Sequence, residues 1–346
     1  MKKSKWMKKG VALATIMAMS VGLLAGCGGS DEGDSKEGKV SDKQYSIGIV
    51  QQVQHGALDQ ANKGMIDGLK DNGFVEGENL TINQQNAQDD QSNLQTIAQT
   101  FVNDDVDLIM AIATQAAQVM ASATQDIPIV GTAITSFEAA KLVESDEEPG
   151  TNVTGTNDMN PVEKQVDLLM QLAPNTKTIG TVYNSSEVNS QLQVDLLEKV
   201  ATEKGLKVEK RTISTANDVQ QAVQSLVGSV EAIWLPTDNK VASAMSQVVS
   251  VTDEAGIPTI TGEESMVAAG GTATYSFSYY KLGYNAGVMA AKILKGEADP
   301  ATMPVESPKA EDLIAVINTD AVKSLGIEVP ADIMESAKTV NSESGV

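Results

Sequence analysis

Short apolar segments alternate with amphipathic segments along most of this chain, and that alternation limits the fold more than any other feature. Residues 45–50 form a short β-type run, and residues 107–113 form a continuous apolar run of the kind that a parallel sheet buries between helices. Between them, residues 57–71 and 94–102 place apolar side chains at helical spacing. The pattern predicts an α/β fold with helices on both faces of parallel sheets.

The alternation runs through the first part of the chain and then restarts. We predict strands at 45–50, 80–82, 107–113, 127–130, 178–183, 206–212 and 232–235, and helices at 57–71, 94–102, 114–124, 190–204, 217–227 and 240–255. Gly73 is placed to end the first helix. Asn160-Pro161 with Glu163 predicts another helix start, with Asn160 as side-chain cap and proline at the first position.

Two segments of the chain repeat the same order of elements. Residues 107–133 and 231–263 each read strand, threonine, helix rich in small residues, Ile-Pro, strand. A duplicated βα unit in a chain of this length predicts two doubly wound, Rossmann-like lobes with a cleft between them.

The N-terminus has the layout of a bacterial secretory signal. Five lysines precede an apolar stretch that covers residues 10–26 and ends in small residues. Residues 24–27, Leu-Ala-Gly-Cys, resemble a lipobox, in which the cysteine receives a lipid, and Cys27 is the only cysteine of the sequence. An ordinary signal peptide or a transmembrane helix is the alternative, but the stretch is short for a span, which needs about 20 residues. We expect lipidation at Cys27, an extracytoplasmic location and attachment to the membrane through the lipid.

Composition excludes several classes of function. Without residues 1–26, 20 basic residues face 46 acidic ones, which argues against nucleic acid and anionic lipid surfaces as partners. His55 is the single histidine, so no multi-histidine metal site is possible. His55 with Asp59 could be imagined as a catalytic pair, but no nucleophile elbow follows a strand. We expect no enzyme activity, no metal and no cofactor.

Polar residues follow the predicted strands, where open α/β sheets bind ligands. Hydroxyls and helix-start N–H groups suit a carboxylate, and Asp238 or Asp158 suits an ammonium group, so the set predicts a zwitterion such as an amino acid. Helix capping by Thr114, Ser185 and Asp238 is the alternative. Trp234 is expected in the core. The predicted ligand-binding residues are Gln54, His55, Thr114, Thr132, Asp158, Tyr183, Asn184, Ser185, Ser186, Glu187, Asp238 and Asn239.

Several segments together resemble a known family. They are His55-Gly-Ala-Leu-Asp, Asn86-Ala-Gln, Ile112-Ala-Thr-Gln-Ala-Ala-Gln, Ile127-Pro-Ile-Val, Asn152-Val-Thr-Gly-Thr, Tyr183-Asn-Ser-Ser-Glu with Asn189-Ser190, and Leu235-Pro-Thr-Asp-Asn. Residues 45–306 resemble the type I periplasmic solute-binding proteins of ABC importers, in the branch of tryptophan- and tyrosine-binding lipoproteins.

The resemblance implies a three-stranded hinge, near residues 156–159, 275–279 and 303–307. The expected parts are a signal peptide at 1–26, a flexible acylated linker at 27–43, an N-terminal lobe of 44–157 plus 277–304, a C-terminal lobe of 158–276 plus 305–340, and a disordered tail at 341–346. In the site, the 183–187 turn and Thr114 would hold the ligand's carboxylate. Asp238, with Asp158 as a second candidate, would bind its ammonium group. The loop around His55 would flank the ligand's side chain. Gly131 stands where relatives often carry a larger residue, which predicts a wider pocket.

The implied function is capture of an aromatic amino acid (tryptophan, tyrosine or phenylalanine) by a monomer that closes at its hinge. Delivery would be to a permease with a separate ATPase, since this chain has no Walker motif. The alternative is a surface receptor or adhesin that senses a small ligand on the same fold.

Overall fold

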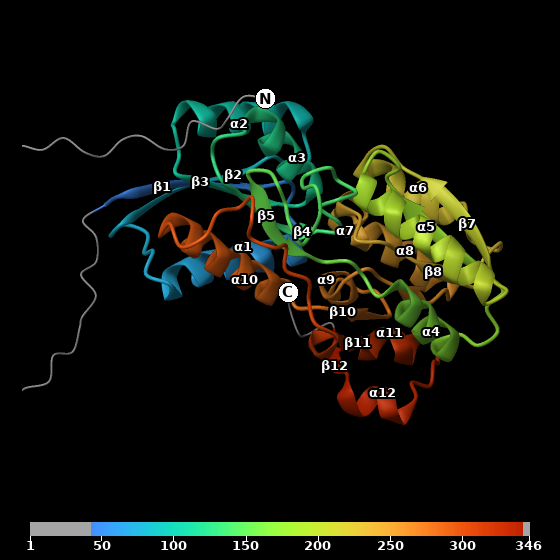
Figure 1. Ribbon diagram of the computed structural model, residues 1–346. Helices are drawn as coiled ribbons and strands as arrows, with labels where there is room; N and C mark the ends of the chain where they lie inside the picture. The colour runs from blue at the N-terminus through green and yellow to red at the C-terminus, as the bar shows by residue number, and fades with distance from the viewer. Residues whose placement is uncertain (1–42, 342–346) are drawn as a thin grey trace, which may run out of the picture. The chain divides into compact units, whose positions relative to one another are not determined.

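The computed structural model describes residues 43–341, and its first sheet is built from five parallel strands in the order β2-β1-β3-β4-β5 (Figure 1). The strands are β1 (Tyr45–Gln51), β2 (Leu80–Asn86), β3 (Leu108–Ile112), β4 (Ile129–Ile134) and β5 (Val153–Asn157). Every residue of β3 is buried, as the continuous apolar run predicts. The strand β2 extends beyond the predicted 80–82 because it lies at the sheet edge, where its polar second half is exposed.

Helices cover both faces of this sheet. Figure 1 shows α1 (Gly56–Asp71) and α10 (Tyr279–Leu294) on one face, with α2 (Gln91–Asn103) and α3 (Thr114–Ala123) on the other. The predicted apolar face of α2 is confirmed, since Leu94 and Phe101 are buried in the core. The chain therefore returns to this lobe after the second sheet to supply α10.

Glycines allow α1 and α10 to pack backbone against backbone. A Cβ at Gly283 would lie 1.9 Å from the carbonyl oxygen of Ala61, and a Cβ at Gly64 would lie 2.1 Å from that of Tyr280. Gly68 and Gly287 make equally close approaches. No side chain larger than hydrogen fits at these positions unless the two helices separate.

The second sheet has the strand order β12-β11-β10-β9-β8-β6-β7. Only the β10–β11 pair is antiparallel. Its strands are β6 (Thr178–Tyr183), β7 (Lys207–Thr212), β8 (Ala232–Trp234), β9 (Thr259–Ile260), β10 (Ala273–Ser276), β11 (Ile314–Asn318) and β12 (Lys338–Val340). The helices of this lobe are α4 (Val162–Leu172), α5 (Val188–Glu203), α6 (Val219–Gln224), α7 (Asn239–Ser243), α8 (Met245–Ala255), α9 (Glu264–Ala268), α11 (Thr319–Ser324) and α12 (Ala331–Ser336), with 3₁₀ turns at Ala216–Asp218 and Ala310–Asp312.

Two local predictions were wrong in this lobe. The helix predicted over 240–255 is interrupted at Ala244, whose φ of −111° and ψ of 21° separate α7 from α8. Asn160 does not cap α4, because its side-chain amide instead donates to Gln193 Oε1 at 3.1 Å. Trp234 is fully buried in the core, as expected.

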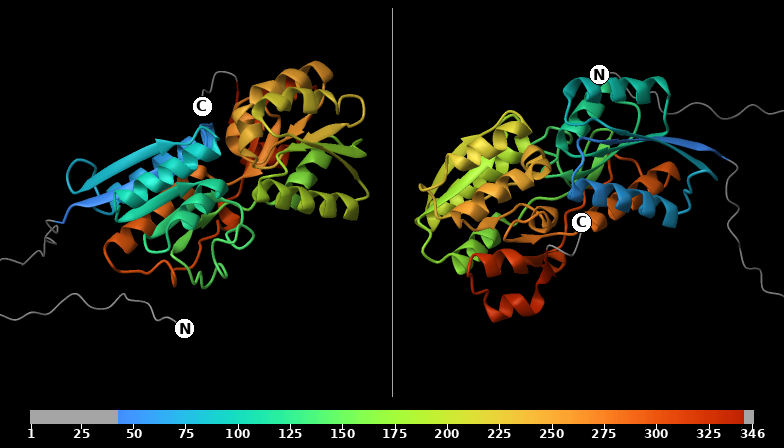
Figure 2. Two further views of the ribbon diagram at one scale, coloured as in Figure 1. Left: turned by 90° about the horizontal axis from the view of Figure 1, so that it is seen from above. Right: turned by 180° about the vertical axis from the view of Figure 1, so that it is seen from behind.

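The chain passes between the two sheets three times, after β5, between β10 and α10, and near Glu306. Glu306 is hydrogen-bonded to β5 through backbone bonds to Gly155 and Asn157 of 2.8 and 3.0 Å. The two sheets with their helices form separate layered lobes in both views of Figure 2. This is the predicted architecture of two doubly wound lobes joined by three crossings.

The predicted signal peptide, Cys27, nearly all of the linker and the predicted tail after residue 341 lie outside the described residues. Within residues 43–341, no helix combines the length and the apolar character needed to cross a membrane.

Candidate functional site

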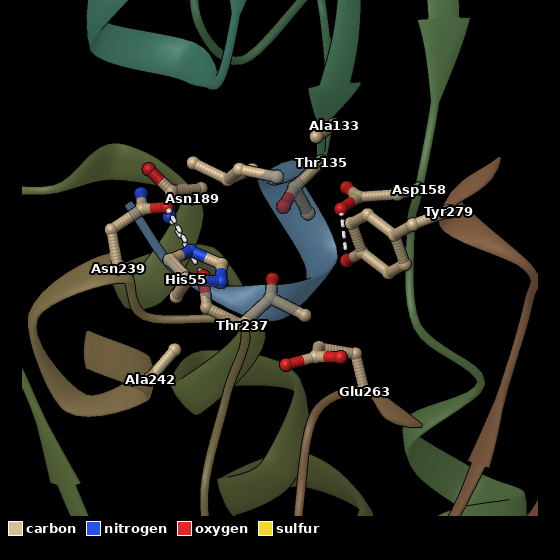
Figure 3. A pocket seen from close by; sticks show the side chains of 11 residues that line it. His55, Ala133, Thr135, Asp158, Asn189, Thr237, Asn239, Ala242, Glu263 and Tyr279 are labelled. Carbon is tan, nitrogen blue, oxygen red and sulfur yellow. Dashed lines mark hydrogen bonds between the residues drawn. The ribbon is translucent and has the colours of Figure 1, made fainter. Parts of the chain in front are cut away.

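A small cavity lies between the two lobes (Figure 3). The first lobe supplies residues from the start of α1, the end of β4 and the start of α10. The second lobe supplies residues from the start of α5, from α7 and from the loops after β8 and β9, and Asp158 lies on the crossing after β5. The lining residues are His55, Leu58, Ala133, Thr135, Asp158, Asn189, Thr237, Asn239, Ala242, Glu263 and Tyr279. The cavity thus lies where parallel strands end, as the rule for open α/β sheets requires.

Polar contacts join the lobes around this cavity. Ala57 N donates to Ser265 Oγ at 3.0 Å across the lobes. Lys240 of the second lobe and Asp89 of the first form an ion pair at 2.5 Å, with their side chains only 11% and 21% exposed. These bonds hold the lobes in a closed arrangement.

An irregularity in β4 positions residues of the first lobe in the cavity lining. The β4–β5 register shifts between Gly131 and Ile134, and Ala133 within this bulge has a φ of +55°. Ala113, at the end of β3, also lies at positive φ, +84°. Positive φ is costly for a residue other than glycine, and such strain concentrates at functional sites. The bulge places Ala133 and Thr135 in the cavity lining.

Asp158 presents a free carboxyl oxygen to the cavity. Its side chain is 4% exposed, and Tyr279 donates its hydroxyl to Oδ2 at 2.5 Å. Oδ1 is buried and has no hydrogen-bond partner among the described residues. Burial raises the pKa of Asp158, and hydrogen bonding to the Tyr279 and Thr135 side chains opposes that rise. A buried carboxyl oxygen without a partner is costly, so the site favours a ligand that brings a donor to it.

The His55 ring is held in a defined tautomer. Asn239 Nδ2 donates to Glu187 at 2.9 Å, which leaves Asn239 Oδ1 as the acceptor facing His55 Nε2 at 3.2 Å. His55 Nε2 therefore carries the proton in this contact. Burial lowers the pKa of His55, so the ring is neutral at pH 7 and Nδ1 is an acceptor.

Nδ1 of His55 and Oδ1 of Asn189 are also buried without a partner. Asn189 Nδ2 is occupied, because it donates to Glu187 and to the Thr237 carbonyl at 3.3 Å each. Three side chains that line the cavity, those of Asp158, Asn189 and His55, thus each carry one buried acceptor without a donor among the described residues.

Gln193, behind the cavity, orients two hydroxyl groups. Its Oε1 accepts from the backbone N–H of Thr237 at 3.1 Å, which fixes the direction of the amide. Its Nε2 then donates to Thr135 Oγ1 at 3.2 Å and to Thr237 Oγ1 at 2.7 Å. Since each hydroxyl accepts from Gln193, its own proton points away from Gln193, toward the cavity or the neighbouring Asp158.

A buried carboxylate network supports the second lobe's side of the cavity. Burial and the nearby charge of Asp238 raise the pKa of Glu187 to about 7. Burial also raises the pKa of Glu263 to about 7, although Ser265 and the Met266 backbone donate to it. Among residues 43–341, no group of three or more histidine, cysteine or acidic side chains is arranged to hold a metal ion.

The model of the family described as ABC transporter substrate binding protein matches residues 46–341. The chain belongs to this family. The substrate-binding protein is 42% identical to a tyrosine-binding protein of Clostridioides difficile, over 93% of each chain.

Two solved structures show which conformation this substrate-binding protein adopts. A Streptococcus domain in complex with L-Trp is 38% identical and superposes with a TM-score of 0.83, covering 86% of this chain and all of that one. A ligand-free, open substrate-binding protein with adhesive properties from Clostridium difficile is 45% identical at the same coverage, yet its TM-score is only 0.67. Greater sequence identity with poorer superposition indicates a different lobe arrangement, and the closed contacts described above agree with the ligand-bound form.

Of the predicted ligand-binding residues in this substrate-binding protein, His55, Asp158 and Asn239 line the cavity. Asp238 does not, because its carboxylate is occupied as the cap of α7 by the backbone N–H groups of Lys240 and Val241. It also accepts from Asn184 N at 2.6 Å and Ser190 Oγ at 2.7 Å. The geometry therefore favours Asp158 over Asp238 as the partner of an ammonium group.

The other predicted residues lie outside the cavity lining. Tyr183 is buried in the core of the second lobe, and the turn after it closes on itself, since Ser186 donates twice to Asn184 Oδ1. Thr132 is bonded to Thr156 at 2.8 Å. Gln54, Ser185 and Ser186 are exposed, and Thr114 is the buried first residue of α3. Glu187 supports Asn239 and Asn189 rather than reaching the cavity itself.

The prediction that Gly131 widens the pocket was wrong. A Cβ at Gly131 would lie 2.5 Å from Ile134 Cδ1 and 3.3 Å from the Phe137 ring. Core side chains of the first lobe thus fill the space that a larger residue would take.

The predicted ligand-binding set leaves out the lining residues Thr135, Asn189, Thr237, Glu263 and Tyr279. Thr135, Thr237 and Glu263 follow predicted strands, so the strand-end rule applies to them. Asn189 and Tyr279 lie in the first turns of α5 and α10, where nothing local separates a ligand contact from packing.

Proposed function

We propose that this substrate-binding protein captures an aromatic amino acid outside the cytoplasm and delivers it to an ABC permease that works with a separate ATPase. The observation that carries the proposal is the buried, unpartnered Oδ1 of Asp158 in a cavity between closed lobes. The lining of that cavity contains no lysine or arginine, so the site is built to receive a cation.

The ligand's two charged groups have distinct partners. The ammonium group binds Asp158 Oδ1, and the hydroxyls of Thr135 and Thr237, oriented by Gln193, donate to the carboxylate. Thr135 comes from the first lobe and Thr237 from the second, so the ligand binds both lobes only when they are closed. Such a ligand shifts the hinge equilibrium toward the closed form.

Similarity to the tyrosine-binding protein and to the L-Trp complex supports an aromatic side chain for the ligand. Leu58, Ala133 and Ala242 supply the apolar part of the lining. We further propose, from the sequence, that the chain acts as a monomer on the outer face of the cell membrane, attached through a lipid on Cys27. It binds without catalysing a reaction.

A second candidate function rests on the relative with adhesive properties, which is 45% identical to this chain. In that case the same fold acts as a surface receptor or adhesin. The two candidates share the ligand site and differ in what the closed form contacts.

Isothermal titration calorimetry with the twenty amino acids, after native mass spectrometry of the purified protein, tests the proposal. We expect micromolar or tighter binding of at least one aromatic amino acid. Asp158→Asn should weaken that binding by about 2 kcal/mol or more, because an amide cannot neutralise a buried ammonium group.

Asp238→Asn is the control outside the cavity, since it removes a buried charge of the same type, keeps the cap of α7 through one oxygen and loses the acceptor for Asn184 N and Ser190 Oγ. Its affinity should change much less than that of Asp158→Asn. The proposal is wrong if no aromatic amino acid binds, or if the two variants lose affinity equally.

A further inference from the structure

The acceptors without a donor occupy two separate sides of the cavity. Figure 3 shows Asp158 with Tyr279 on one side and His55 with Asn189 on the other. Asp158 is assigned to the ammonium group in the proposed function, on which this inference rests. The two acceptors on the far side, His55 Nδ1 and Asn189 Oδ1, have no partner in that assignment.

Both far-side atoms are fixed as acceptors by their surroundings. His55 Nε2 donates to Asn239 Oδ1, whose amide is in turn held by the buried Glu187, so a neutral ring leaves a lone pair on Nδ1. Asn189 uses its amide N–H groups on Glu187, Ser190 Oγ and the Thr237 carbonyl, which directs Oδ1 outward from that network. Neither side chain can rotate to become a donor without breaking these bonds.

We infer that His55 Nδ1 and Asn189 Oδ1 select ligands whose side chain ends in a hydrogen-bond donor. The phenol O–H of tyrosine and the indole N–H of tryptophan are such donors, whereas phenylalanine has none. Binding phenylalanine would leave two buried acceptors without partners, and a site built around a polar group strongly rejects an analogue that lacks it. His55 and Asn189 are therefore specificity-determining residues.

Burial keeps His55 an acceptor despite the charged group near its ring. Asp59 favours the protonated ring through its charge, but burial has the larger effect and lowers the pKa of His55. A protonated ring would turn Nδ1 into a donor and remove the selectivity.

The test compares ligand affinities within one protein, by calorimetry with tyrosine, tryptophan and phenylalanine. In the wild-type protein, the better of tyrosine and tryptophan should bind at least about tenfold more tightly than phenylalanine. In His55→Phe, which replaces the acceptor with a ring, this ratio should fall below about threefold. A purely structural role for His55 would weaken all three ligands by the same factor and leave the ratio unchanged, which would refute the inference.

A second comparison does not depend on any variant folding. Methylation removes the side-chain donor from each ligand, giving 1-methyltryptophan from tryptophan and O-methyltyrosine from tyrosine. The wild-type protein should bind each methylated ligand at least about tenfold more weakly than its parent amino acid. Wild-type protein that binds phenylalanine as tightly as tyrosine and tryptophan overturns the inference and leaves the proposed function intact. Wild-type protein that binds none of these ligands overturns the proposed function itself.

Discussion

The ion pair between Lys240 and Asp89 should control how tightly the lobes close. Lys240 Nζ of the second lobe lies 2.5 Å from Asp89 Oδ2 of the first lobe. Asp89 also accepts from Gln52 at 3.3 Å, and its φ of +58° is one that asparagine adopts readily. Asp89→Asn therefore removes the charge while keeping the backbone and one acceptor oxygen.

The size of the effect follows from the burial of the pair. A hydrogen bond to a charged group contributes about 1.5–3 kcal/mol, and the amide retains part of it, which leaves a loss of about 1–1.5 kcal/mol. Since the pair forms only when the lobes meet, that loss reduces the population of the closed form. Ligand affinity should fall about five- to tenfold.

Calorimetry with the bound amino acid measures this change, and Asp90→Asn is the matched control. Asp90 is the neighbouring residue, exposed, and caps α2 through Asn93 N, a role that asparagine fills equally well. Added salt should weaken binding to the wild-type protein more than to Asp89→Asn. Equal affinity in the two variants, or the same salt response in Asp89→Asn and wild type, would refute a closing role for the pair.

Two further predictions concern stability. Gly283→Ala should lower the free energy of unfolding by about 2 kcal/mol or more, because its Cβ would meet the Ala61 carbonyl. The control Gly205→Ala has open space and a φ of +74°, and it should lower the free energy of unfolding by about 1 kcal/mol. Urea unfolding measures both losses, and equal losses would contradict the close helix contact. The pKa of Glu263 in the folded state is about 7, above the ordinary 4.5, so the folded state binds the proton more tightly than the unfolded state does. The free energy of unfolding should therefore fall by up to about 3 kcal/mol as the pH rises from about 4.5 to beyond 7. Unfolding of Glu263→Gln across that range should show a shallower decline, and an unchanged slope would remove Glu263 as a source.

The fold was predictable because it depends on patterns that local sequence expresses. Leu94 and Phe101 of α2 repeat at helical spacing, and β3 is apolar throughout, so the sequence of each element indicates which residues are buried. The break at Ala244 was not predictable, because alanine is a good helix former and nothing at this position in the sequence indicates a helix end.

The site was predictable only as a region. The strand-end rule selected the correct loops, but it cannot tell Asp158, with a free oxygen, from Asp238, whose oxygens cap a helix. That difference depends on which donors of distant segments reach each carboxylate. The role of Gln193 was not predicted for the same reason, since its contacts with Thr135 and Thr237 join residues far apart in the sequence.

The glycine contact between α1 and α10 has a consequence for the order in which the chain matures. Part of the apolar cover over one face of the first sheet, including Ala286, Met289 and Leu294, comes from a helix made after most of the second sheet. A chain that emerges N-terminus first holds Met65 and Leu69 uncovered until α10 arrives. Because β11 and β12 of the second sheet follow α10 in the chain, neither lobe is complete until nearly the whole polypeptide has been made.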